Sequence, residues 1–233
     1  MDWTARAQAY LETDWVFYAD MLESLRRGTA ELLYAAEDGV LLYETLGEVY
    51  MMSVRTPEAA ARCFGRMTDC RLLVGHELWY KEEAAARYSL TEEEMICYQA
   101  AWPGGIAPPE PGISLRRLEP DMAGWAYDHY SHRFCEVDYI EDAIARGMLG
   151  AFVEGHPAGF VGTHPEGSIG LLEVLPAYRR RGVGKALLHG AVRQALAQGA
   201  IPYGQVEEGN APSLALQRKA GMAVSEKRLF WLS

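Results

Sequence analysis

GLLEVLPAYRRRGVGKALLHGAVRQALAQG, residues 170–199, joins an apolar strand to a helix through a basic turn that contains two glycines. Pro176 ends the strand, because proline lacks the N–H that a sheet ladder needs. Apolar residues in the helix recur three to five positions apart and share one face, and Gly199 is its predicted stop. The turn from Arg179 to Gly184 directs backbone N–H groups, a helix dipole and arginine side chains at one small volume. This pattern predicts a site for a phosphate or pyrophosphate.

The composition is that of an acidic globular protein. The 233 residues carry a formal net charge of −10, with 49% hydrophobic and 23% charged residues. Such values are ordinary for a folded protein. Nucleic acids and anionic membranes require a broad basic surface, so we expect neither as a partner. Three consecutive arginines are a local exception in this chain, and they indicate a specific anion.

The spacing of the cysteines and the length of the apolar runs indicate whether the protein binds a metal and where in the cell it is expected. Cys63, Cys70, Cys97 and Cys135 show no metal-ligand spacing such as C-x-x-C. The N-terminal sequence MDWTARAQAY lacks the pattern of a signal peptide, and no apolar run approaches the roughly 20 residues that span a bilayer. We therefore expect a reduced, cytoplasmic protein without a metal site.

A segment rich in proline and glycine, WPGGIAPPEPG at 102–112, separates two halves of mixed character. Such a composition is typical of a linker, so we expect domains at 1–105 and 106–233. The first half predicts helices within 3–27, strands at 31–35, 40–46 and 48–54, a helix at 58–68, a strand at 71–74, a helix at 76–87 and another capped by Thr91. The second half predicts a strand at 113–118, helices at 120–133 and 138–146, strands at 149–154, 158–164 and 168–175, the helix of the opening stretch, a strand at 203–207, a helix at 211–220 and a strand at 222–232.

Both halves contain three strands followed by a proline and a helix. One interpretation is that the first half is a degenerate copy of the second, and chance similarity is the other. In either case Arg55-Thr56-Pro57 stands in place of the basic glycine turn. The first half is therefore expected to lack the anion site.

Two motifs follow each other across one predicted strand. They are Val174-x-Pro176-x-Tyr178-Arg179-x-x-Gly182-x-Gly184 and Asn210-x-x-Ser213-x-x-Leu216-x-x-Lys219-x-Gly221-Met222. Together they resemble the GCN5-related N-acetyltransferase (GNAT) superfamily. The pattern Leu-Glu-Val-Leu-Pro-x-Tyr-Arg with residues 206–213 looks most like the C-terminal domain of glycine N-acyltransferase-like proteins, whose N-terminal domain lacks a working acyl-CoA site. The resemblance implies an α+β fold with a mixed, mostly antiparallel sheet flanked by helices, preceded by a smaller α/β domain. It also implies acetyl-CoA or another acyl-CoA as co-substrate.

Under this resemblance the anion site becomes the pyrophosphate site of coenzyme A. Backbone amides of the turn are expected to donate to the pyrophosphate, glycines admit its approach, and arginines add charge-assisted bonds. In the family, two strands part near the proline, the pantetheine arm lies between them, and an amide near Val174 faces the thioester oxygen. The expected CoA-binding residues are Val174, Leu175, Arg179, Arg180, Arg181, Gly182, Val183, Gly184, Lys185, Asn210 and Ser213. Helix capping is an equal interpretation of Asn210.

Acyl transfer to an amine needs a base for the ammonium group. Glu173 is the carboxylate nearest to the expected thioester position. Strand alternation turns it away from Val174 unless a bulge intervenes, and a carboxylate facing a neighbouring helix is the alternative interpretation. Glu166, at the preceding turn, and Glu207, on the partner strand, are rival candidates.

The usual acid of the reaction is replaced in this chain. Family members often carry a tyrosine after the leucine of the final motif, where this sequence has Gln217. Glutamine cannot supply a proton, so Tyr178, Tyr203 or a water molecule is the candidate substitute. An ordinary packing role is the alternative for each tyrosine.

The sequence thus predicts an enzyme that transfers an acyl group directly from acyl-CoA to a primary amine of a small molecule or amino acid. A protein or peptide amine is the alternative acceptor. A non-catalytic module that binds acyl-CoA is the alternative function. A homodimer is one option for the assembly.

Overall fold

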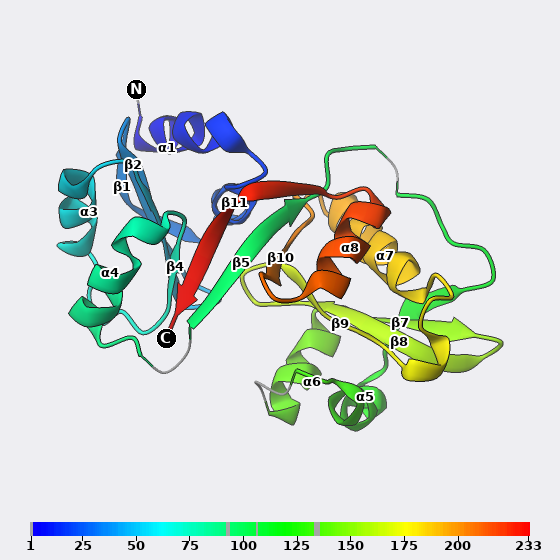
Figure 1. Ribbon diagram of the computed structural model, residues 1–233. Coiled ribbons are helices and arrows are strands. Elements are labelled where there is room, and N and C mark those ends of the chain that lie inside the picture. The colour runs from blue at the N-terminus through cyan, green and yellow to red at the C-terminus, as the bar shows by residue number, and fades with distance from the viewer. Residues whose placement is uncertain (1, 92–93, 106, 133–135) are drawn as a thin grey trace. The chain divides into compact units, whose positions relative to one another are not determined.

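The computed structural model describes residues 2–91, 94–105, 107–132 and 136–233, and the chain divides into two compact units (Figure 1). The first unit contains the described residues up to Ala101 together with Gln205–Ala211 and Val224–Ser233. The second contains Trp102–Gly204 and Pro212–Ala223. Two late segments thus belong to the first unit, whereas the expected boundary between residues 105 and 106 divides the chain once. That boundary stays a prediction.

The first unit follows the predicted order of elements as far as Tyr88. Its helices and strands are α1 (Trp3–Leu11), α2 (Ala19–Arg27), β1 (Ala30–Ala36), β2 (Gly39–Glu44), β3 (Val49–Val54), α3 (Pro57–Phe64), β4 (Leu73–Gly75), α4 (Lys81–Tyr88) and β5 (Glu94–Ala101). Gly28 ends α2 in the left-handed conformation, at φ 70°, which glycine adopts without steric cost. Thr56 caps α3, since its Oγ1 accepts a hydrogen bond from the Ala59 N–H at 3.2 Å.

The helix predicted after Thr91 is wrong. Residues 92 and 93 lie outside the described residues, and Glu94–Ala101 form strand β5. An acidic run after threonine is a helix-start pattern, but Cys97 and Gln99 are buried at alternate positions, as in a strand. Pairing with strands more than 100 residues later in the chain overrides the local signal.

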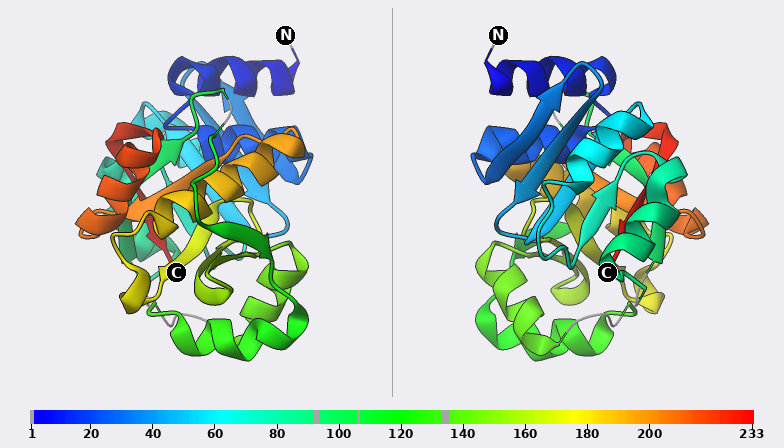
Figure 2. Two further views of the ribbon diagram at one scale, coloured as in Figure 1. Left: turned by 90° about the vertical axis from the view of Figure 1, so that its right-hand side faces the viewer. Right: turned by 90° about the vertical axis from the view of Figure 1, so that its left-hand side faces the viewer.

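Seven strands form the larger sheet, in the order β1-β2-β3-β4-β11-β5-β10, where β10 is Tyr203–Glu207 and β11 is Ala223–Leu232. Among its pairs, β1 with β2, β2 with β3 and β4 with β11 are antiparallel, and β3 with β4 is parallel. Successive residues of a strand point to opposite faces. Met51 accordingly packs with α1 and α2, and Met52 packs with α3 and α4. Helices therefore cover both faces of the strands β1 to β4 (Figure 2, right).

The second unit contains a four-stranded antiparallel sheet in the order β6-β7-β8-β9. Its strands are β6 (Ser114–Arg117), β7 (Leu149–Val153), β8 (His156–Thr163) and β9 (Ile169–Val174), and its helices are α5 (Ala123–His129), α6 (Val137–Ala145), α7 (Val183–Ala197) and most of α8 (Ala211–Ala220). Side chains of α5 and α6 share a core with Phe160 and Leu171. Helix α7 packs closely on the sheet, because a Cβ on Gly190 would lie 2.5 Å from Leu115 Cδ1. Figure 1 shows α5 and α6 below this sheet and α7 above it.

The predicted fold class is confirmed: the protein has α+β architecture with a mostly antiparallel sheet flanked by helices. The helix predicted over 120–133 is shorter, because α5 ends at His129; residue 133 lies outside the described residues. None of the helices in the described part of the chain has the length and apolar character that a membrane span needs.

Candidate active site

Strand β9 carries the bulge on which the position of Glu173 depends. Gly162 of β8 pairs with Gly170 and Phe160 pairs with Glu173, so two residues of β9 oppose one of β8. Leu171, inside the bulge, adopts a left-handed φ of 50°. Such bulges bend a strand and redirect its side chains.

Beyond the bulge, Glu173 and Val174 point to opposite sides of the sheet. Glu173 faces the segment that links α5 to α6, where it accepts hydrogen bonds from Ser131. Val174 faces α7, since a Cβ on Gly184 would lie 3.5 Å from Val174 Cγ2. The bulge leaves these two residues in ordinary strand alternation.

No ladder joins β9 to β10 among the described residues, and the two strands belong to different sheets. Their first residues nevertheless meet within the second unit. A Cβ on Gly204 would lie 2.6 Å from the Ile169 carbonyl oxygen, and the Tyr203 hydroxyl donates to the Glu166 carbonyl at 3.1 Å. Beyond Val174 the chain turns at Pro176 into a short 3-10 helix, Pro176–Tyr178.

The N-terminus of α7 is open for an anion. Gly182 precedes the helix at φ 86°, no side chain caps the helix, and its first turn contains no acidic residue. The first N–H groups of a helix have no acceptor within it, and the helix dipole is positive there. A Cβ on Gly182 would meet only Ile113, at 3.8 Å. Space and donors for a phosphate group are therefore both present.

Gly184 also has a packing role within the second unit. A Cβ at this position would lie 3.3 Å from Leu216 Cδ2 of α8. The glycine therefore permits α7 to pack closely on α8 and β9. The close approach serves neighbouring side chains and needs no bound phosphate to explain it.

The basic residues of the turn have different partners. Arg179 turns back on β9, where its Nε donates to the Val174 carbonyl at 3.0 Å and its Nη2 lies 3.3 Å from Glu173 Oε1. Lys185 pairs with Glu110 at 2.8 Å. Neither Arg180 nor Arg181 pairs with a carboxylate in the part of the chain that the structure describes. These two guanidinium groups remain available for a bound anion.

Glu173 is buried, with 8% of its surface exposed, and is held by three donors. Its Oε2 accepts from the Ser131 N–H at 3.1 Å and from the Ser131 hydroxyl at 2.5 Å, and its Oε1 pairs with Arg179. The carboxylate therefore has one defined orientation. Ser131 carries no recognisable signal in the sequence, because its role depends on a contact with a residue 42 positions away.

The rival carboxylates are placed elsewhere. Glu166 precedes β9, and Val174 is the last residue of that six-residue strand, whose two ends lie roughly 17 Å apart at about 3.3 Å per residue step. It is buried and accepts a hydrogen bond from the Ser168 hydroxyl. Glu207 is exposed and belongs to the first unit.

The candidate acids also differ in their surroundings. Tyr203 is fully buried and bonded to the Glu166 backbone, as a packing residue is. Tyr178 is half-buried in the turn directly after β9, and the guanidinium of Arg181 lies 5.4 Å from its ring centroid. Of the two tyrosines, only Tyr178 lies at the end of β9 that carries Glu173.

Gln217, in α8, is buried, and its side-chain oxygen has no hydrogen-bond partner among the described residues. An unsatisfied buried acceptor costs about 1–3 kcal/mol. A bound pantetheine arm carries amide N–H groups that would satisfy it, so this orphaned oxygen fits the expected co-substrate. Asn210 directly precedes α8, and Ser213 lies in its first turn.

The corresponding place in the first unit is closed to an anion. Helix α3 follows β3 as α7 follows β9, but Thr56 caps it and Glu58 lies in its first turn. Strands β3 and β4 are paired in a parallel ladder from Tyr50 to Met52. The described residues contain no group of three or more metal-ligating side chains in either unit.

The comparisons with known proteins cover sequence and structure. The sequence profile of the Acetyltransferase (GNAT) family matches residues 113–222, from the start of β6 to the end of the second motif. No functionally curated protein matches the sequence. The closer resemblance to glycine N-acyltransferase-like proteins is not shown by these comparisons, so it stays a prediction.

Solved structures share the fold at low sequence identity. A Drosophila protein superimposes with a TM-score of 0.64 at 15% identity over 84% of this chain and 74% of its own. A GCN5-related N-acetyltransferase from Kribbella flavida gives 0.55 at 14% identity over 93% of both chains. An acetyltransferase from the GNAT family of Colwellia psychrerythraea gives 0.54 at 13% identity over 97% of this chain and 93% of its own. Residues 113–222 thus match the sequence profile of the Acetyltransferase (GNAT) family, and the solved structures show that the chain shares its fold with proteins of that family.

Proposed function

We propose that the second unit catalyses direct transfer of an acyl group from acetyl-CoA to a primary amine of a small molecule or amino acid. The observation that carries this proposal is the uncapped N-terminus of α7, which directly follows the strand end that presents Glu173. The match of residues 113–222 to the GNAT family supports acyl-CoA as the donor. The expected division at residues 105 and 106 assigns the acyltransferase domain to 106–233.

Binding of the co-substrate rests on backbone and side-chain groups that have no hydrogen-bond or ion-pair partner among the described residues. The N–H groups of Val183, Gly184 and Lys185 donate to the pyrophosphate, and Arg180 and Arg181 add charge-assisted bonds. Gln217 accepts a hydrogen bond from the pantetheine arm. Arg179 has a different part in this proposal, since it holds the Val174 carbonyl and Glu173 in place.

The bound thioester supplies the acyl group and the thiolate leaving group. Glu173 removes the proton from the attacking ammonium group, directly or through a water molecule. Ser131 and Arg179 fix the carboxylate, so little reorientation accompanies the proton transfer. Tyr178 is the remaining tyrosine candidate for protonation of the thiolate, and Tyr203 receives no role because it is buried at the far end of β9.

Thiol release tests the proposal. The full chain is incubated with acetyl-CoA and a panel of primary amines and amino acids, and free CoA is followed with a thiol reagent. We expect amine-dependent release with at least one acceptor. Tight acetyl-CoA binding without release for any amine would overturn the catalytic proposal.

A non-catalytic acyl-CoA-binding module is the second candidate. Two observations favour it: three donors already occupy Glu173, and Gln217 stands where a tyrosine acid is usual. The substitution Glu173→Gln separates the two functions. Loss of turnover with retained CoA affinity supports catalysis, whereas binding without turnover in both proteins supports the module. A cytoplasmic location, a homodimer and the protein-amine alternative stay predictions.

A further inference from the structure

The first unit contains a pocket of about 460 Å³ that the proposed reaction does not use. Its wall is formed by the turn between α1 and α2, by the ends of β3 and β4, and by β11. Pockets that bind small molecules have volumes of roughly 300–1,000 Å³. The size therefore fits a metabolite.

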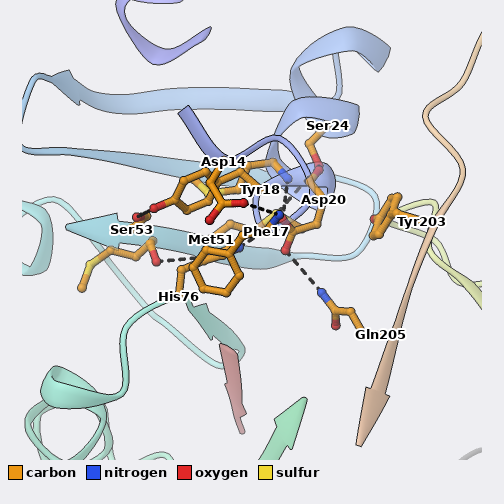
Figure 3. Close-up of polar contacts among 12 residues, drawn as sticks. Asp14, Phe17, Tyr18, Asp20, Ser24, Met51, Ser53, His76, Tyr203 and Gln205 are labelled. Carbon is orange, nitrogen blue, oxygen red and sulfur yellow. Dashed lines mark hydrogen bonds and ion pairs between the residues drawn. The ribbon is translucent and has the colours of Figure 1, made fainter. Parts of the chain in front are cut away.

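His76, one of the lining residues, forms a buried ion pair with Asp20, which does not line the pocket (Figure 3). His76 Nε2 lies 3.1 Å from Asp20 Oδ1, and both side chains are inaccessible to solvent. Burial opposes the charged imidazole, but the charge and hydrogen bond of Asp20 raise the pKa of His76 above its ordinary value. Asp20 also accepts a hydrogen bond from Gln205 at 3.3 Å. The pair neutralises itself and leaves no net charge for a ligand.

Glu77, which also lines the pocket, is bonded to neutral donors. Its carboxylate accepts from the Ser53 hydroxyl at 2.7 Å and from the Val54 N–H at 2.9 Å. Burial raises the pKa of this carboxyl, against the charge of the neighbouring His76, which lowers it. No arginine or lysine pairs with it within the described ranges. A carboxylate held by neutral donors in a pocket is suited to a ligand cation.

Arg55 supplies the opposite charge. It lines the same pocket, and its guanidinium lies 4.5 Å from the ring centroid of Tyr10 without a carboxylate partner among the described residues. Arginine presents a planar fork of donors that matches a carboxylate.

The residues that line the pocket already include one ammonium group, that of Lys227. Lys227 Nζ lies 2.8 Å from Asp14 Oδ2 and 5.3 Å from the centroid of the Phe17 ring. This pair is also neutral as it stands. Arg228 of the lining pairs with Glu208 at 2.8 Å, so the lining charges without an ion-pair partner among the described residues are Arg55 and the two carboxylates Glu77 and Glu226.

We propose that this pocket binds a small zwitterion of the amino-acid class. Its ammonium group pairs with Glu77, its carboxylate with Arg55, and its side chain packs against Phe17 and Tyr18. The site binds without acyl transfer, because the capped N-terminus of α3 offers no place for the pyrophosphate of acyl-CoA.

Calorimetric titration of the full chain with the twenty L-amino acids, each used alone, tests this site. We expect saturable binding of at least one of them. The N-acetyl derivative of the best binder lacks the ammonium group, and the corresponding amine lacks the carboxylate. Each of these two probes should bind at least about tenfold more weakly, because each loses one charge-assisted contact.

Variants locate the binding. Glu77→Gln and Arg55→Gln should each weaken it at least about tenfold, while the control Glu58→Gln, exposed on α3, should bind as the parent does. Arg55 is exposed, so its substitution leaves the fold intact even if that of Glu77 does not.

Binding should also persist in Glu173→Gln, which alters only the second unit. Absence of binding by every amino acid, binding insensitive to both pocket variants, or binding lost in Glu173→Gln would overturn the proposal. Thiol release enters none of these measurements, so they are independent of the proposed enzyme activity.

Discussion

Replacing Glu173 by glutamine removes the proposed base and retains its volume. Glutamine keeps a carbonyl oxygen that can accept one hydrogen bond from Ser131, but it cannot take the proton of the acceptor ammonium. A positioned general base contributes about 10²–10⁴ in rate. We therefore expect kcat to fall by about 10²–10⁴, with the affinity for acetyl-CoA unchanged, because no proposed CoA contact involves this side chain.

The loss of the Arg179 pair should cost little stability. The Arg179 side chain is 58% exposed, and water screens a pair of this kind to at most about 1 kcal/mol. Such a loss lowers Tm by about 2–4 °C in a protein of this size. A thermal melt of the variant thus separates a catalytic defect from misfolding.

The assay combines thiol release with calorimetric titration of acetyl-CoA, and Glu166→Gln is the matched control. Glu166 is equally buried and lies at the other end of β9, so its substitution should reduce kcat less than tenfold. The reasoning is refuted if Glu173→Gln retains the parental kcat, or if Glu166→Gln is the more damaging change.

Four further outcomes are expected. Double substitution of Arg180 and Arg181 by glutamine should raise KM for acetyl-CoA at least about tenfold with little change in kcat. Kinetics at several salt concentrations should show that this KM depends less on salt in the variant than in the parent. Gly182→Ala should lower the free energy of unfolding, measured in urea, by about 1–2 kcal/mol, because alanine is strained at the φ of 86° that Gly182 adopts. A variant as stable as the parent would contradict the left-handed conformation. Asp20→Asn should lower the free energy of unfolding by about 3–5 kcal/mol, because it leaves His76 without its counter-ion. In the parent, the stabilisation from this pair should be complete below about pH 6.5 and should decline as pH rises through the raised pKa of His76. Unfolding free energies that do not decline over that range would oppose this account. Cys63, Cys70 and Cys97 should resist a thiol reagent in the native state, because burial raises the pKa of each thiol to about 12, and rapid labelling of any of the three would contradict their burial.

The second half of the fold follows closely from the sequence because its signals are local. The limits of β10 and α8 coincide with the predicted ones, and the turn before α7 contains its glycines and arginines within six residues. Strand β5 was missed because its partners β10 and β11 come from the C-terminal part of the chain. Local acidity after Thr91 favours a helix there, and only tertiary pairing decides otherwise.

The candidate site likewise combines features that a local stretch of sequence predicts with contacts that only the folded chain reveals. The anion-binding turn is recognisable because one stretch of sequence supplies it. The Ser131 contact that orients Glu173, the Glu110 contact of Lys185 and the unpaired oxygen of Gln217 each depend on residues distant in the sequence. The pocket of the first unit combines segments from residue 13 to residue 228, so no local pattern announces it.

A structure of the full chain with acetyl-CoA tests the central claim most directly. The account predicts the pyrophosphate within hydrogen-bond distance of the Val183, Gly184 and Lys185 N–H groups, with the acetyl group beside Val174 and within reach of the Glu173 carboxylate. A pyrophosphate bound at the N-terminus of α3, or an acetyl group remote from Glu173, would contradict it.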